Sequence, residues 1–168
     1  MEHPLSNFEY RVGLGHDTHR LVTGRALIIG GVRIEFDRGL DGHSDADILL
    51  HAITDAVLGA AGLGDIGDAF PDTDPANKGL DSAIFLNAAL DRVKGLGWSP
   101  VNLDCTIFAQ RPKLVPYKSA IRGRVAELVG LPFESVNVKA KTGEKVGPIG
   151  REEAMSADAI VLLRRASS

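Results

Sequence analysis

The sequence lacks the features that would place a protein outside the cell or in a membrane. Its 168 residues include one cysteine, Cys105, so no internal disulfide bond can form and a reducing, cytoplasmic compartment is expected. No apolar run approaches the length of a membrane span, and residues 1–10 lack the charged start and apolar stretch of a signal peptide. We therefore expect no membrane partner and interpret residues 1–10 as a short lead-in.

A large excess of charge of either sign is also missing. The net charge of −3 argues against nucleic-acid binding by electrostatic attraction alone. It leaves room for a small anionic substrate, because metal ions and a few placed lysines can invert the local field. There is no internal repeat or low-complexity linker, and the length and the apolar fraction of 44% predict one domain with a real core, residues 11–168.

The apolar periodicity predicts an α+β fold, with a mixed β-sheet and helices packed on one of its faces. The predicted strands are 12–15, a hairpin over 26–34 that turns at Gly30-Gly31, 101–109, 136–141 and 157–163. The last strand is almost continuously apolar, which is typical of a central strand. The predicted helices are 44–62, 81–94 and 117–129, and the predicted loops are 37–42, 62–78 and 141–151. An oligomer in which sheets face each other would cover the second face of the sheet.

Three residues have the types and spacing of metal ligands. Asp17 and His19 are two apart and point to the same side of a strand, and His51 lies on the helix that follows. One carboxylate and two imidazoles suit Zn²⁺ with a position left open for substrate. The same set suits non-haem Fe(II), but that interpretation predicts a jelly roll, and the helical periods argue against it. A set of ordinary surface polar residues is the alternative.

The start of the helix over 44–62 carries further candidates. Ser44 and Asp47 resemble a capping box, and Asp47 could also orient His51, which lies one turn later. Free N–H groups at this helix end would attract a phosphate beside His43 and Ser44. Asp55, another turn along, is expected to be a solvated helix residue.

Three loops carry the remaining candidates. The carboxylate-rich loop 64–74 does not fit the calcium-loop pattern, but it could hold a hydroxylated substrate with Phe70 as an apolar wall. The segment 109–114 offers two cations past a strand end, where a nucleotide could bind. The segment 139–147 combines lysines, a hydroxyl and Glu144, which suits phosphate with Mg²⁺. For each loop the alternative is a solvated surface turn.

Five stretches, in order over nearly the whole chain after residue 10, resemble the 2-C-methyl-D-erythritol 2,4-cyclodiphosphate synthase family. They are RVGLGHDTHRL, IIGGVRI, GHSDADILLHAITDAVLGAAGLGDIGDAFPDTDP, AQRPKL and VNVKAKTGEKVG. The resemblance implies a phosphorus–oxygen lyase of non-mevalonate isoprenoid biosynthesis. It would convert 4-diphosphocytidyl-2-C-methyl-D-erythritol 2-phosphate into the 2,4-cyclodiphosphate and CMP. It also implies a homotrimer with active sites between neighbouring subunits.

The resemblance assigns roles to individual residues. Zn²⁺ would be held by Asp17, His19 and His51, and a second ion, Mg²⁺ or Mn²⁺, would be bound by Glu144 through the phosphates. Phosphate would be positioned by His43, Ser44 and Thr142. The methylerythritol pocket would be lined by Asp65, Gly67, Phe70, Pro71, Asp72, Thr73 and Asp74. The cytidine end would be bound by Ala109, Gln110, Arg111, Pro112, Lys113, Leu114 and Val115. Further substrate contacts would come from Lys141, Gly143 and Arg151.

The chain departs from the usual family pattern in the segment 141–153. Lys141 and Gly143 stand where threonines are usual, Pro148 replaces a phenylalanine, and Glu152 replaces a glycine. Thr142 and Glu144 are retained, so the phosphate and metal roles stand.

Two other functions remain open at this point. A metal-dependent phosphohydrolase would use the same metal ligands with water as the nucleophile. A non-catalytic nucleotide-binding module would hold a structural zinc closed by four protein ligands, whereas the sequence offers three good candidates.

Overall fold

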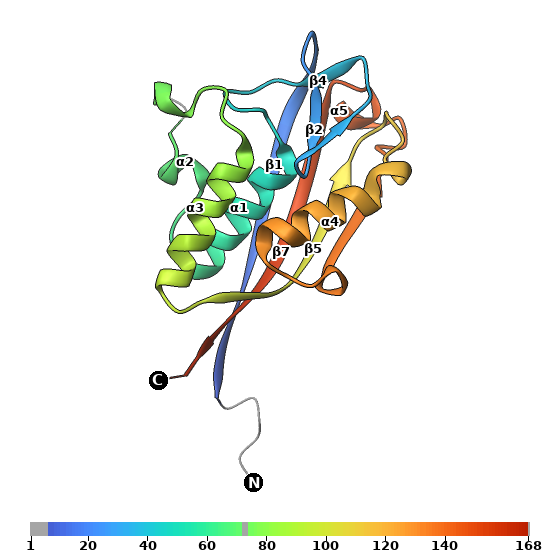
Figure 1. Cartoon of the computed structure of the whole chain (residues 1–168). Coiled ribbons are helices and arrows are strands. Elements are labelled where there is room, and N and C mark those ends of the chain that lie inside the picture. Colours follow the sequence, from blue (N-terminus) through green and yellow to red (C-terminus); the bar gives the residue numbers. More distant parts are fainter. Residues whose placement is uncertain (1–6, 72–73, 168) are drawn as a thin grey trace.

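The structure, a computed structural model, describes residues 7–71 and 74–167 (Figure 1). A five-stranded sheet with the order β4-β1-β7-β5-β6 forms its centre. The strands are β1 (Phe8–Thr23), β4 (Arg38–Leu40), β5 (Ser99–Phe108), β6 (Val136–Lys141) and β7 (Ala154–Ala166). β5 and β6 pair in parallel and the other neighbours are antiparallel, so the sheet is mixed.

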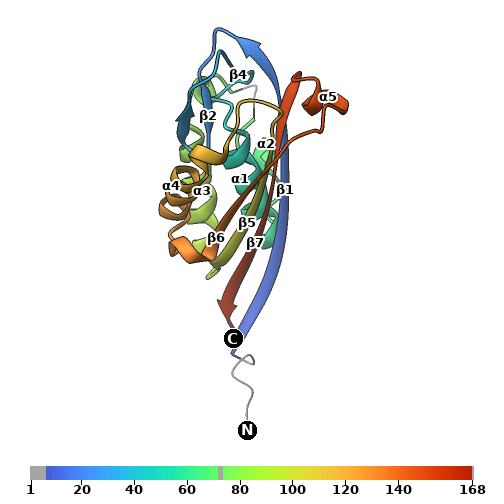
Figure 2. The same cartoon turned by 90° about the vertical axis from the view of Figure 1, so that its right-hand side faces the viewer.

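Helices cover one face of this sheet, as Figure 2 shows from the side. They are α1 (Ile48–Ala61), α3 (Ser82–Gly95) and α4 (Lys118–Val129). α1 lies on β1 and β7, α3 packs beside α1, and α4 packs on β6. The predicted α+β architecture is confirmed, and so is the central place of β7, which lies between β1 and β5.

Two glycines of β1 allow α1 to approach the sheet unusually closely. A Cβ at Gly13 would lie 1.9 Å from the carbonyl oxygen of Ala56, and one at Gly15 would lie 1.9 Å from that of Ala52. Any side chain at either position would therefore push the helix away from the strand. The Gly13-Leu14-Gly15 pattern is a packing device that brings the backbone of α1 against β1.

A small hairpin and several short helices complete the chain. β2 (Leu27–Ile29) and β3 (Val32–Ile34) pair around Gly30 and Gly31, which both have positive φ, so the predicted hairpin is confirmed. The short α-helices are α2 (Ile66–Ala69) and α5 (Gly147–Gly150), and the 3₁₀ helices are η1 (Pro75–Asn77), η2 (Val115–Tyr117) and η3 (Phe133–Ser135). Within the described ranges, no helix is both long enough and apolar enough to cross a bilayer.

Several predicted boundaries were wrong. β1 begins at Phe8 because residues 8–10 pair with 164–166 of β7, so part of the expected lead-in belongs to the sheet. β4 occupies the predicted loop 37–42 because it pairs with 21–23. α2 and η1 interrupt the loop expected over 62–78, and α5 interrupts the one over 141–151.

The start of α1 was also predicted wrongly. The helix begins at Ile48 with Asp47 as its N-cap, not at Ser44. The Asp47 carboxylate accepts hydrogen bonds from the N–H groups of Leu49 and Leu50, and also from those of Gly30 and Gly31 in the hairpin turn. These four bonds fix the helix start three residues later than the capping-box pattern predicts.

Candidate metal centre

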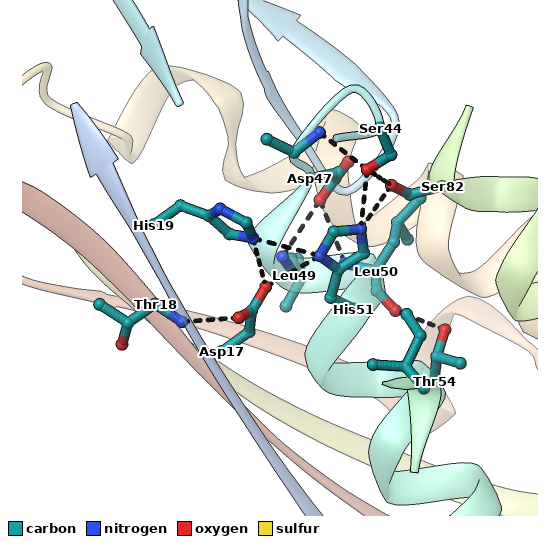
Figure 3. A network of polar contacts seen from close by, with 12 residues as sticks. Asp17, Thr18, His19, Ser44, Asp47, Leu49, Leu50, His51, Thr54 and Ser82 are labelled. Carbon is teal, nitrogen blue, oxygen red and sulfur yellow. Dashed lines mark hydrogen bonds and ion pairs between the residues drawn. The ribbon is translucent and has the colours of Figure 1, made fainter. Parts of the chain in front are cut away.

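Asp17, His19 and His51 converge on one point, with one candidate ligand atom from each lying within 4.8 Å of the others (Figure 3). The Oδ2 atom of Asp17 lies 2.9 Å from Nε2 of His19 and 2.9 Å from Nδ1 of His51. The two ring nitrogens are 3.4 Å apart. The structure therefore confirms that these three side chains meet, as their spacing predicts.

The local fold explains this convergence. Alternation along β1 turns Asp17 and His19 towards the helical face, as it does Gly13 and Gly15. The close approach at these glycines brings the first turn of α1, and with it His51, over the strand. The strand and the helix thus supply a rigid frame for the three side chains.

Hydrogen bonds orient both imidazoles from outside the centre. Nδ1 of His19 donates to the carbonyl oxygen of Asp41 at 2.5 Å, so in a neutral, metal-binding ring Nε2 would be the bare nitrogen. Nε2 of His51 lies 2.8 Å from the hydroxyl of Ser82 and 3.2 Å from that of Ser44. Partners of this kind are typical around metal-binding histidines.

The electrostatics favour an anionic carboxylate between the two rings. Burial alone would raise the pKa of Asp17, but its hydrogen bonds with His19 and His51 outweigh this effect and hold the pKa well below its ordinary value. Burial alone would lower the pKa of His19, but the hydrogen bond with Asp17 and the Asp41 carbonyl raise it. The carboxylate of Asp17 therefore favours the protonated form of His19.

Asp47 does not orient His51, contrary to the alternative considered from the sequence. Its carboxylate bonds are with the helix start and the hairpin turn, so the capping interpretation holds. Asp47 also accepts from the N–H groups of Leu49 and Leu50, so these two groups are not free for the phosphate that was expected beside His43 and Ser44. Asp55 was misjudged too, because its carboxylate accepts from the N–H of Ile66 at 2.8 Å and ties α1 to α2.

A cavity of about 220 Å³ opens beside the three candidate ligands. It is lined by Asp17, His19, Gly42, His43, Ser44, His51, Ile66, Gly67, Phe70, Asn77 and Phe85. The predicted residues His43, Ser44, Gly67 and Phe70 thus lie beside the metal centre. Phe70 packs on Phe85 with ring centroids 4.9 Å apart, so the expected apolar wall is made of two rings.

Four lining residues had no individual role among the sequence predictions: Gly42, Ile66, Asn77 and Phe85. Phe85 lies on α3, and its three-residue spacing from Ser82 became informative only once the structure had placed Ser82 beside His51. Asn77 lies in η1 and donates to the carbonyl of Pro71 at 3.0 Å, a contact that no spacing pattern indicates.

The other residues of the loop 64–74 have different places. Asp65 caps α2 by accepting from the N–H of Asp68 at 2.9 Å. The backbone N–H of Asp74 donates to the carbonyl of Pro71 at 3.0 Å. Asp72 and Thr73 lie outside the described residues.

The loops expected to bind cytidine and phosphate, which follow β5 and β6, lie away from the three candidate metal ligands in space. Asp17, Ala157, Ile107 and Ala140 are aligned across the sheet, on β1, β7, β5 and β6. Three inter-strand spacings put the first and last of these backbones about 14 Å apart. The loops that follow β5 and β6 are at the same end of the sheet as the metal centre, but their described residues do not line its cavity.

These two loops contact each other instead. The backbone N–H of Lys145 donates to the side chain of Gln110 at 3.3 Å, and Arg111 makes hydrogen bonds of 2.8 and 3.0 Å to Glu152. Thr142 donates to the carboxylate of Glu144 at 2.8 Å. The predicted site residues therefore form two groups, one around the metal centre and one on these loops.

Other predicted residues of the second group have identifiable structural roles. Ala109 and Leu114 are buried, so their side chains belong to the core. Gly143 is required because a Cβ there would lie 2.4 Å from the backbone nitrogen of Gly150. Lys141 is the exposed last residue of β6, and Arg151 pairs with Glu153 at 2.8 Å.

The sequence model of the YgbB family matches residues 10–164, almost the whole chain. The chain belongs to the YgbB family. One relative, the 2-C-methyl-D-erythritol 2,4-cyclodiphosphate synthase of Bordetella petrii, is 55% identical over 161 residues, which cover 96% of this chain and 99% of the relative. The resemblance found in the sequence is thereby confirmed.

Solved structures of YgbB relatives share the fold. A 2-C-methyl-D-erythritol-2,4-cyclodiphosphate synthase in a CDP-bound form matches with a TM-score of 0.85 and 39% identity over 91% of this chain and 99% of that one. The bifunctional IspDF of Campylobacter jejuni matches with a TM-score of 0.90 and 44% identity over 94% of this chain. The match spans 43% of that longer chain.

Proposed function

We propose that this YgbB-family chain is an enzyme that converts 4-diphosphocytidyl-2-C-methyl-D-erythritol 2-phosphate into 2-C-methyl-D-erythritol 2,4-cyclodiphosphate and CMP. The observation that carries the proposal is the convergence of Asp17, His19 and His51 beside an open cavity. The names of the relatives and the CDP in one solved synthase support the choice of substrate.

The residues present fit a zinc ion. Three donors of the types that zinc prefers face one point, and the cavity leaves room for a fourth ligand from the substrate. Asp17, His19 and His51 would hold Zn²⁺, and Glu144 would help to hold Mg²⁺ or Mn²⁺ through the phosphates. When bound, such ions supply positive charge that polarises phosphoryl oxygens.

The substrate would contact the two groups of residues at its opposite ends. The methylerythritol part would lie against Phe70 and the segment 65–74, and phosphates against His43, Ser44 and Thr142. The cytidine end would be bound by residues 109–115, with Lys113 central. Lys141, Gly143 and Arg151 would complete the contacts around the phosphates.

Because the two groups of residues lie apart within a single copy of the protein, we assign the complete site to two neighbouring copies in a homotrimer. The sheet face opposite the helices supports this assembly, since it exposes a cluster of apolar side chains. Val12 and Leu14 are each 68% exposed and Ile160 is 47% exposed. Exposed apolar clusters of this kind favour association. The loops of one copy would then reach the metal centre of the next.

The reaction needs no nucleophile from the protein. The 2-phosphate of the substrate attacks its own β-phosphorus, a new P–O bond forms, and the bond to CMP breaks. Cys105 is buried in the core, and this burial raises the pKa of its thiol to about 12. The thiol therefore stays protonated and does not serve as a nucleophile.

The main obstacle to this cyclisation is the repulsion between the 2-phosphate and the diphosphate of the substrate. Two unit charges about 4 Å apart repel each other by about 4 kcal/mol at an effective dielectric of 20. Thr142 and the hydroxyl of Ser44 would donate to phosphate oxygens and offset part of it. Holding both ends of one molecule contributes more, since well-oriented intramolecular reactions gain roughly 7–11 kcal/mol.

Incubation of the purified protein with the cytidine diphosphate substrate, Zn²⁺ and Mg²⁺ tests the proposal. Mass spectrometry should find the cyclic diphosphate and CMP in equal amounts. Linear products that have incorporated water would identify a phosphohydrolase instead. Binding of CDP without turnover would identify a nucleotide-binding module.

A further inference from the structure

Behind His51 lies a chain of hydrogen bonds that the proposed reaction does not use directly. Nε2 of His51 is 2.8 Å from the hydroxyl of Ser82, and this hydroxyl donates to Oδ1 of Asp45 through a short hydrogen bond. Ser82 is fully buried, and the ring of His51 largely so. The three residues come from α1, from the start of α3 and from the turn that precedes α1.

We propose that Ser82 and Asp45 are positioning residues for the metal centre, because they keep the proton of neutral His51 on Nε2 and leave Nδ1 bare for the metal. This inference rests on the proposed function only in that Asp17, His19 and His51 must bind a metal ion. It adds two residues to the metal site that touch neither the metal nor the substrate.

The positions of the hydrogen atoms follow from an inventory of donors and acceptors. The ionised carboxylate of Asp45 can only accept, so the single hydroxyl proton of Ser82 is directed to it. The Ser82 oxygen can then only accept from His51, and Nε2 must carry a proton. In the neutral imidazole that binds a metal ion, the other nitrogen, Nδ1, is then a bare acceptor, without the proton that Asp17 accepts in the metal-free protein. Nδ1 is the atom that lies 2.9 Å from Asp17 and 3.4 Å from His19.

Asp45 is itself held in place. Its backbone N–H donates to the carbonyl of Leu80 at 3.0 Å, and its carboxylate accepts from the backbone N–H groups of Asp47 at 3.1 Å and Ser82 at 3.2 Å. These contacts join the turn before α1 to the start of α3. The acceptor that fixes the Ser82 hydroxyl is therefore rigid.

Ser44 is compatible with the same arrangement. Its oxygen accepts from the N–H of Ala46 at 3.1 Å and lies 3.4 Å from the Ser82 oxygen, so its own proton can point to Ser82. Its distance of 3.2 Å to Nε2 of His51 is longer than that of Ser82. Ser82 is therefore the principal partner of His51.

The two imidazoles would thus use opposite nitrogens, Nε2 in His19 and Nδ1 in His51. His19 is fixed by the backbone carbonyl of Asp41, which no substitution removes. His51 is fixed by a side chain. The orientation of His51 can therefore be tested by mutagenesis.

The test measures zinc affinity by competition with a chromogenic chelator, on wild type, Ser82→Ala, Asp45→Ala and the double variant. Ser82→Ala should bind zinc 10- to 100-fold more weakly, the usual effect of losing an outer partner of a metal ligand. Asp45→Ala should also weaken zinc binding, because the freed Ser82 proton can then donate to Nε2 and move the histidine proton to Nδ1. The double variant should be no weaker than the weaker single variant, since both act through one hydrogen-bond chain.

Asp81→Ala is the matched control. Asp81 caps the same end of α3 by accepting from the N–H of Ala83 at 2.8 Å, but it takes no part in the hydrogen bonds that join His51, Ser82 and Asp45. Its loss should lower stability and leave zinc affinity unchanged. A second readout is the NMR signal of the Nε2 proton of His51 in the zinc-bound protein. The signal should be protected from solvent exchange in wild type and Asp81→Ala, and should exchange rapidly in Ser82→Ala.

Two results would overturn the inference and can be told apart. Tight zinc binding by wild type with equal affinity in Ser82→Ala and Asp45→Ala would overturn the inference alone. Absence of zinc binding by wild type would overturn it together with the metal assignment of the proposed function. An equal loss of affinity in Asp81→Ala would show that only the stability of the α3 end matters, which also contradicts the inference.

Discussion

Asp17 and His51 are 34 positions apart in the sequence, yet Oδ2 of one lies 2.9 Å from Nδ1 of the other. The contact depends on Gly15, two residues before Asp17, because α1 rests its backbone on this position. The candidate metal centre is therefore built on a helix–strand contact that tolerates no side chain.

Gly15→Ala should destabilise the protein by about 3 kcal/mol, the upper range for overpacking. The added Cβ would lie 1.9 Å from the carbonyl of Ala52, so α1 has to move and His51 moves with it. Urea unfolding measures the stability and a chelator assay the zinc affinity, which should fall too. Gly59→Ala is the control: Gly59 lies in the same helix with nothing within 4 Å of an added Cβ, and alanine there should gain up to about 1 kcal/mol. Equal stabilities of the two variants would refute the packing argument.

His51→Ala should remove bound zinc and lower turnover by at least 1,000-fold, about 4 kcal/mol of transition-state stabilisation. His16→Ala is the matched control, since His16 precedes Asp17 on β1 but bonds Asp158 on the opposite face of the sheet at 2.6 Å. Elemental analysis of the purified variants gives the zinc content. A normal zinc content in His51→Ala would remove His51 from the ligand set.

The metal-free protein should show a stability contribution from the Asp17–His19 pair that depends on pH. The pKa of Asp17 is lowered from 3.8, so its contribution is present above that value and is lost as the pH falls below it. The pKa of His19 is raised from 6.5, so its contribution is present below that value and is lost as the pH rises through the raised pKa. Asp17→Asn should therefore be most destabilising between pH 4 and 6.5, measured by urea unfolding in the presence of a chelator. A destabilisation that stays constant up to pH 9 would contradict the assignment.

Leu14→Glu should convert the proposed trimer into monomers that still bind zinc. Leu14 is 68% exposed on the face opposite the helices, and a carboxylate there would be buried and unpaired in an assembly. Sedimentation velocity measures the oligomeric state. Leu96→Glu is the control, because Leu96 is a 47% exposed apolar residue after α3, and this variant should keep the oligomeric state of the wild type. A wild-type protein that sediments as a monomer would rule out the proposed assembly.

Glu152→Gln should weaken CDP binding several-fold without changing the zinc content. The Glu152 carboxylate pairs with both Arg38 and Arg111, and so ties the proposed cytidine loop to β4. Its ion pairs also hold the pKa of Glu152 below its ordinary value. Glu127→Gln, which breaks the exposed pair with Arg124 inside α4, is the control. Calorimetry that finds equal CDP affinity in both variants would show that Glu152 does not order the loop.

The sequence predicted those parts of the fold that depend on local patterns. The hairpin at Gly30-Gly31, the helices near 81–94 and 117–129 and the strand 136–141 follow from turn residues and periodicity, and the structure contains all of them. The strand β4 was missed because three residues show no periodicity, and it exists through pairing with β1. The helix start at Ser44 was wrong because Asp47 has partners in the distant hairpin, which a local capping pattern does not reveal.

The sequence by itself determined the identity of the candidate metal ligands, because Asp17, His19 and His51 have the right chemistry and the periods of a strand and a helix place them on defined sides. Only the tertiary structure decided that they meet, through the glycine contact between β1 and α1. It also decided that Ser82 and Asp45 lie behind His51, and that the loops after β5 and β6 lie apart from the cavity. The physical reason is that periodicity fixes the direction of a side chain within one element, whereas the distance between elements depends on how their backbones pack.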